Sequence, residues 1–215
     1  SGVWIMAYTT IDNPELYFQA KLYTGDGTNG QAITFDGSEN MQPDWVWIKS
    51  RSGTAYHELH DSVRGASKRL FSNDASAETD VGTVSSFDSN GFTVSRNSSY
   101  DGTNQNSINF ASWNWKAGGS ASSNTDGSIT TTVSANQTAG FSIIKYAGNS
   151  TNSTIGHGLG ASPEYIIFKE IDGTESWRVH SVHTPNNSSN TLALNLTSAA
   201  FSQSNWISAI SSSTI

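Results

Sequence analysis

The stretch Pro-Asp-Trp-Val-Trp-Ile-Lys at residues 43–49 decides the fold class, and a related stretch, Pro-Glu-Tyr-Ile-Ile-Phe-Lys, follows at residues 163–169. Side chains alternate between the two faces of a β-strand. The two tryptophans of the first stretch therefore share one face, and its valine and isoleucine share the other. Apolar residues on both faces predict a central strand covered on both sides, or a strand that offers its aromatic face to a partner.

The chain repeats itself at the spacing that separates these two stretches. The stretches themselves are offset by 120 residues, from 43 to 163, and FQAKLYTG at 18–25 aligns with FSIIKYAG at 141–148. We interpret the chain as two copies of one unit, because such self-similarity is typical of tandem repeats. The predicted organisation is an N-terminal extension (1–13), a first unit (14–118), a Gly/Ser linker (119–127) and a second unit (128–215).

Composition and turn signals predict an all-β fold. The chain of 215 residues is rich in Trp, Phe and Tyr, and its Gly, Asn, Ser and Asp residues separate short alternating segments. Asn90-Gly91 is a strong hairpin signal between two such segments. We expect two tandem β-sandwich or jelly-roll units, with strands near 18–24, 31–35, 44–50, 56–61, 68–72, 84–95 and 107–116, a short helical turn at 74–79, and second-unit strands near 130–134, 140–147, 153–156, 164–170, 176–181 and 190–196.

The second unit is expected to be incomplete at its C-terminal end. Adding the repeat offset to 91–95 and 108–116 places their counterparts near or beyond residue 212. We therefore expect an uncovered apolar edge in the second unit unless further residues or a neighbouring chain supply its last strands. The apolar residues should otherwise fill two separate interiors.

Charge and composition exclude several classes of function. Eleven basic against eighteen acidic residues give a net charge of −7, which disfavours binding to a phosphate backbone, so we expect no nucleic-acid partner. The absence of cysteine removes disulfides, thiolate metal sites and cysteine catalysis. No apolar run reaches the length of about 18 residues that a membrane helix needs, so we expect no membrane insertion.

The sequence offers no convincing catalytic, metal or cofactor site. His57 and His60 are three residues apart in a predicted strand, so they point to opposite faces, unlike the ligands of a zinc-protease helix. His57 is replaced by Trp177 in the second copy, which no metal ligand could be. The carboxylates Asp44, Glu58, Asp61 and Glu78 are candidates for a glycosidase pair, but only the first has an acidic counterpart. We therefore expect no enzymatic activity, no metal and no cofactor, and we interpret Gly156–Gly160 as a turn rather than a phosphate-binding loop.

Aromatic residues near polar loops are the candidates for contact with a glycan. Tyr100, Trp177 and Trp206 are the three that we select, since aromatic rings stack on sugar faces.

Several segments resemble a repeated domain of tail-fibre-like and other appendage proteins of marine tailed phages. They are PDWVWIKSRSG (43–53), DSVRGASKRLFSN (61–73), SFDSNGFTVS (86–95), WNWKAGG (113–119) and, for the next repeat, 140–169. The resemblance implies concanavalin-like, lectin-like β-sandwiches in a virion appendage, without catalytic residues. We expect a non-enzymatic structural and adhesive module that forms a homo-oligomer, assembles with other virion appendage subunits and presents loops to a host surface glycan. The alternative is a carbohydrate-binding module of a secreted bacterial protein.

Overall fold

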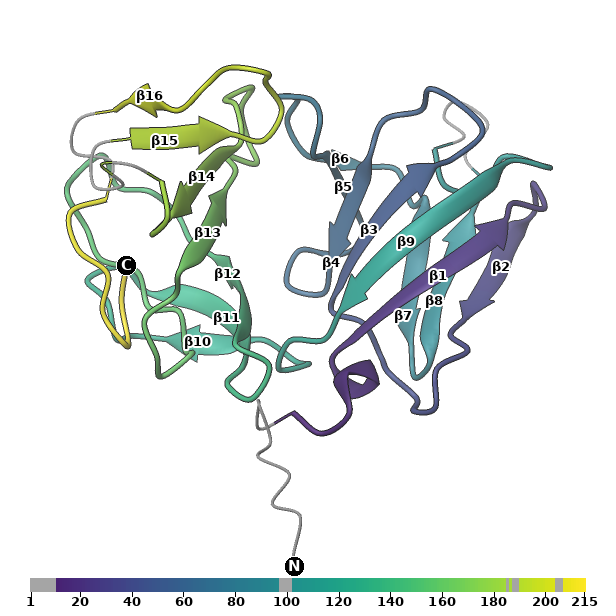
Figure 1. The fold of residues 1–215 in the computed structure, drawn as a ribbon, viewed down its shortest axis with the longest axis horizontal. Helices are drawn as coiled ribbons and strands as arrows, with labels where there is room; N and C mark the ends of the chain where they lie inside the picture. Colours follow the sequence, from purple (N-terminus) through teal and green to yellow (C-terminus); the bar gives the residue numbers. More distant parts are fainter. Residues whose placement is uncertain (1–10, 97–101, 185, 187–189, 204–206) are drawn as a thin grey trace, which may run out of the picture.

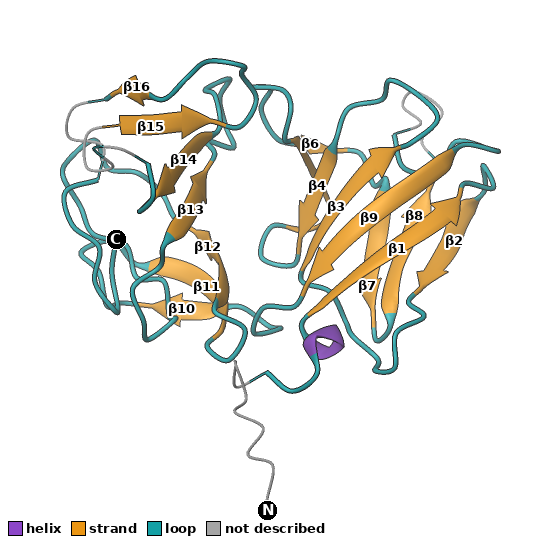
Figure 2. Ribbon diagram, viewed as in Figure 1, coloured by secondary structure: helices purple, strands orange, loops and turns teal. Residues whose placement is uncertain are grey.

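The protein is nearly all β in a computed structural model, which describes residues 11–96, 102–184, 186, 190–203 and 207–215 (Figures 1 and 2). The strands of its sheets pair antiparallel. One 3-10 turn, η1 (Pro14–Leu16), precedes the first strand, and the Asn13 side chain accepts a hydrogen bond from the backbone N–H of Glu15 at 3.0 Å. No helix in the described part of the chain has the length and apolar character needed to cross a bilayer.

Residues 14–116, here called the N-terminal unit, form a sandwich of two sheets (right side of Figure 1). The larger sheet has the order β1 (Phe18–Thr24), β9 (Asn109–Trp115), β3 (Trp45–Ser50), β4 (Glu58–Asp61), β5 (Gly65–Phe71) and β6 (Thr79–Asp80). The smaller sheet has the order β2 (Asn29–Thr34), β8 (Gly91–Ser95) and β7 (Val84–Asp88). The predicted hairpin at Asn90-Gly91 joins β7 to β8, and Gly91 has the positive φ of 123° that favours glycine.

The core of the N-terminal unit lies between these sheets, and β3 supplies it from one face only. Val46 and Ile48 are fully buried there, whereas Trp45 and Trp47 point to the opposite face. The buried cluster is completed by Ile33, Phe35, Met41, Val84, Phe92, Val94 and Phe110. The division of these side chains between two faces, predicted from the alternation in the sequence, is therefore confirmed.

Residues 117–215, the C-terminal unit, contain two further sheets (left side of Figure 1). One has the order β10 (Ser122–Asn124), β11 (Thr131–Asn136) and β12 (Phe141–Lys145). The other has the order β13 (Tyr165–Phe168), β14 (Arg178–Ser181), β15 (Asn190–Ala193) and β16 (Phe201–Ser202). The chain end returns to this unit through an antiparallel bridge between Gly156 and Thr214.

The second apolar cluster joins the two units, so the expectation of two separate interiors is only half right. Trp177 is 3% exposed and packs against Leu59 and Leu70 of the N-terminal unit. Its indole Nε1–H donates to the carbonyl oxygens of Phe71 at 2.7 Å and Asp74 at 3.0 Å. One side chain of the C-terminal unit is thus anchored in the N-terminal unit by both apolar and polar contacts.

Two local predictions are wrong. The predicted helical turn at 74–79 is irregular and leads into β6 instead. The predicted linker 119–127 contains strand β10, and its start is fixed because the Asp44 carboxylate accepts hydrogen bonds from the N–H groups of Ala117 at 2.8 Å and Gly119 at 3.1 Å. A flexible connector would not be held in this way, because buried backbone donors need fixed acceptors.

Candidate binding cavity between the two units

A cavity of about 1240 Å³ lies between the units and is the candidate functional site. Its wall on the N-terminal side is the outer face of the larger sheet, and its wall on the other side comes from β12, β13 and the segments that follow them. This volume is somewhat larger than the roughly 300–1,000 Å³ of typical small-molecule sites, so the cavity has room for such a ligand.

Aromatic side chains form the N-terminal wall. Trp45 and Trp115 lie opposite each other on β3 and β9, and Phe141 of β12 approaches both, with ring-centroid distances of 6.2 and 6.3 Å. Trp47 continues the wall and contacts Trp113 at 6.4 Å. Offset and tilted aromatic contacts at such distances stabilise a surface on which planar or apolar groups can stack.

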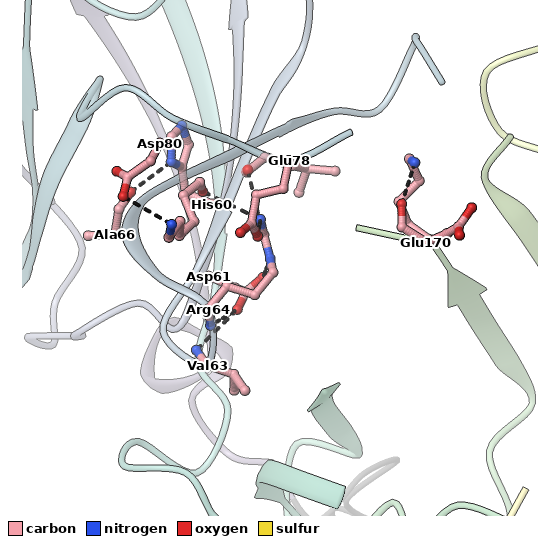
Figure 3. Close-up of polar contacts among 11 residues, drawn as sticks. His60, Asp61, Val63, Arg64, Ala66, Glu78, Asp80 and Glu170 are labelled. Atoms are coloured by element: carbon pink, nitrogen blue, oxygen red, sulfur yellow. Dashed lines mark hydrogen bonds and ion pairs between the residues drawn. The ribbon is translucent and has the colours of Figure 1, made fainter. Parts of the chain in front are cut away.

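Arg64 lines the cavity and follows β4 in a tight turn, and Figure 3 shows its polar contacts. Its guanidinium donates to the Asp61 carboxylate at 2.5 Å and to the Glu78 carboxylate at 2.9 Å. Asp61 also accepts the backbone N–H of Arg64 at 2.8 Å, so the turn and the ion pair stabilise each other. Arg64 therefore links the carboxylates of Asp61 and Glu78, and its role is structural.

A cation of the C-terminal unit also lines the cavity. Lys169 donates to the carbonyl oxygens of Glu170 at 2.5 Å and Gly173 at 3.1 Å. Burial lowers the pKa of Lys169 below its ordinary value, although the neighbouring carboxylates oppose this effect. Its contacts close the loop after β13.

The histidine motif is structural, as the sequence predicts. His60 is fully buried, with Nδ1 2.8 Å from the Ala66 carbonyl oxygen and Nε2 3.2 Å from the Glu58 carboxylate. Glu58 also accepts the hydroxyl of Thr83 at 2.7 Å. His57 lies beside Trp47 instead, and burial, with a contribution from Lys49, lowers its pKa. The described residues contain no group of three or more potential metal ligands from His, Cys, Asp and Glu.

The four carboxylates considered for glycoside hydrolysis are all engaged in structural contacts. Asp44 binds the backbone at the start of the C-terminal unit, Asp61 and Glu78 bind Arg64, and Glu58 binds His60. None of these contacts pairs one carboxylate with another across an open site.

Of the predicted glycan-contact residues, Trp177 lies in the described part of the chain, where it lines the cavity with only 3% of its surface exposed. Trp177 is buried against the N-terminal unit, so its ring is not available for stacking on a sugar. Its position is fixed by packing partners more than a hundred residues earlier, which its local sequence does not reveal. Tyr100 and Trp206 lie outside the described residues.

The aromatic wall itself was missed as a site. The sequence feature that could have indicated it is the alternation at 43–49, which places Trp45 and Trp47 on one face that is able to meet a partner. The sequence did not show that Phe141 and Tyr165 would stand opposite this face.

The fold and the cavity define an all-β protein with two packed antiparallel units. The chain belongs to the family described as a domain of unknown function, DUF7483, whose model matches residues 13–215 and therefore spans both units. No curated protein and no solved structure matches the chain.

Proposed function

We propose that this chain is a non-enzymatic structural and adhesive module of a phage virion appendage, such as a tail fibre or spike. The observation that carries the proposal is the anchoring of the C-terminal unit in the N-terminal unit through the buried Trp177. An appendage must hold its successive β units in a fixed relation if the loops at its far end are to reach a host surface. The resemblance of 43–53, 61–73 and 113–119 to repeats of phage appendage proteins supports the same assignment.

Immuno-electron microscopy of purified phage particles tests the assignment. Antibodies raised against the 215-residue chain should label an appendage at a constant distance from the capsid. Detection of the protein in infected cells by mass spectrometry, together with its absence from purified particles, would refute a role in the virion.

The second candidate is a carbohydrate-binding module of a secreted bacterial protein, and the aromatic wall of the cavity favours it. Tyr165 lines the cavity and is 56% exposed, so its ring can meet a sugar. A glycan array should then give binding that Tyr165→Ala abolishes and Tyr56→Ala preserves. Tyr56 is the matched control because it is 43% exposed and lies outside the cavity lining. Equal binding by both variants would exclude this cavity as the sugar site.

A further inference from the structure

Strand β9 completes the larger sheet of the N-terminal unit. It lies between β1 and β3 and pairs antiparallel with both along its length. Trp115 of β9 stands opposite Phe18 on one side and Trp45 on the other. Toward the core, Phe110 of β9 stacks on Tyr23 at 5.1 Å. This one strand therefore separates the core of the unit from the outer face of its sheet.

The four strands β13, β14, β15 and β16 of the C-terminal unit follow one another in their sheet in the same order as β3, β4, β5 and β6 of the N-terminal unit. In β3 and β4, Trp45 pairs with Asp61, and in β13 and β14, Tyr165 pairs with Ser181, so both partners are shifted by 120 residues. The loop contacts agree, since Lys49 donates to the carbonyl oxygens of Ser50 and Gly53 as Lys169 does to those of Glu170 and Gly173. Strand β13 therefore corresponds to β3, and the alignment of 18–25 with 141–148 makes β12 the counterpart of β1.

The position of β9 is open in the C-terminal unit. Strand β12 ends one sheet and β13 begins the next, and no strand of the described residues lies between them. A single cavity is lined by Trp45 and Trp115, by both strands, and by Ile155 and His157 on the inner side of the C-terminal unit. The cavity thus connects two regions that β9 separates in the N-terminal unit.

Side chains at corresponding positions of the two units differ in how deeply they are buried. Val46 and Ile48 are fully buried, whereas their counterparts Ile166 and Phe168 are partly exposed. Tyr23 is partly buried beneath Phe110, whereas its counterpart Tyr146 is 42% exposed. A strand at the open position would cover the ring of Tyr146, as Phe110 of β9 covers Tyr23.

The free edge of β13 has backbone groups in the orientation that a strand needs. The N–H of Val182 donates to the carbonyl oxygen of Glu164, so the Tyr165–Ser181 pair is of the non-hydrogen-bonded kind. The N–H groups of Tyr165 and Ile167 consequently point away from β14 and toward the open position. Edge strands with such groups are templates for pairing with another segment.

We propose that the space between β12 and β13 is a strand-acceptor site that binds one extended polypeptide segment with the side-chain pattern of β9. The segment runs antiparallel to both strands, as β9 does to β1 and β3. The register of β9 places an aromatic side chain between Phe141 and Tyr165 and a second one against Tyr146. Main-chain hydrogen bonds provide affinity and the alternate side chains provide specificity, as in other cases of β-strand addition. The proposal rests on the pairing geometry and is independent of the virion assignment.

A synthetic peptide with the sequence of residues 107–117, SINFASWNWKA, is the probe. The 215-residue chain should bind it with 1:1 stoichiometry in isothermal titration calorimetry. A control peptide carrying Phe110→Ser and Trp115→Ser should bind at least about tenfold more weakly, because it lacks the two aromatic anchors. Absence of binding by the folded chain at millimolar peptide, or equal binding of the two peptides, would overturn the proposal.

Variants of the chain test the location and the backbone contribution. Tyr165→Pro removes one N–H donor that Tyr165→Ala keeps, so peptide affinity should be about fivefold lower for the proline variant than for the alanine variant. Tyr146→Ala should also weaken binding, whereas Tyr56→Ala should not. Hydrogen exchange should show new protection in β12 and β13 when the peptide binds. Protection at β1 or β16 instead would place the peptide elsewhere and refute the site.

Discussion

Replacing Trp177 with alanine tests whether this side chain couples the two units. The indole is 3% exposed and is anchored by Leu59, Leu70 and the carbonyl oxygens of Phe71 and Asp74. Truncation of a buried tryptophan costs about 3–5 kcal/mol, and this range includes the residual cavity. The more conservative Trp177→Phe keeps much of the apolar contact, removes the one N–H that the two carbonyl oxygens share, at about 1 kcal/mol, and loses about 1 kcal/mol of packing with the smaller ring. We therefore expect losses of about 4 and about 2 kcal/mol.

Urea unfolding followed by far-UV circular dichroism and by tryptophan fluorescence is the assay. With a slope of about 2 kcal/mol/M, a loss of 4 kcal/mol corresponds to a shift of about 2 M in the midpoint of the affected unit. We expect the wild-type chain to unfold in one coincident transition and Trp177→Ala in two, with the C-terminal unit unfolding first. Limited proteolysis at 117–121 should accelerate in parallel.

Trp113→Ala is the matched control for this experiment. Trp113 is 38% exposed on β9, and loss of its cross-strand contact should cost about 1 kcal/mol or less without separating the units. If Trp177→Ala keeps a single transition and a midpoint equal to that of Trp113→Ala, the buried indole does not couple the units and the reasoning is refuted.

Three further predictions concern polar groups. Glu58→Ala should destabilise the chain by about 3–5 kcal/mol in thermal unfolding, because it removes the buried carboxylate that His60 and Arg69 contact. A loss below about 1 kcal/mol would contradict this. Asp44→Ala should cost about 2 kcal/mol and speed cleavage at 117–121; unchanged proteolysis would show that the carboxylate does not hold the connector. Hydrogen bonds from the side chain and backbone of Ser76 lower the pKa of Asp74 below its ordinary value of 3.8, so its stabilising contribution is present above the unfolded-state pKa and is lost as the pH falls through the folded-state pKa. An NMR titration of Ser76→Ala should find the pKa of Asp74 raised, and an unchanged value would assign the shift to another cause.

Much of the N-terminal unit could be predicted because its strands carry local signals. The segment 18–24 coincides with β1, and Asn90-Gly91 marks the hairpin between β7 and β8. Alternation at 45–48 placed Trp45 and Trp47 on one face and Val46 and Ile48 on the other, and the structure confirms this division. These features depend on periodicity and turn chemistry within a few residues, which the sequence contains directly.

The C-terminal half shows where such signals stop. The polar segment 119–127 gives no sign of β10, because that short strand forms only against β11. The local sequence also does not show that Gly118 packs against the carbonyl oxygen of Ala135, an approach that a Cβ would prevent. The structure of residues 119–127 is therefore determined by strand pairing with another segment rather than by the β-propensity of its own residues.

The sequence by itself determined the all-β class, the central role of β3 and the correspondence between 43–49 and 163–169, since alternation and spacing are properties of the chain alone. Only the tertiary structure decided that Trp177 anchors one unit in the other, and that β12 and β13 are end strands of two separate sheets. Both depend on contacts between residues separated by tens of positions or more, and such contacts arise only when the sheets pack.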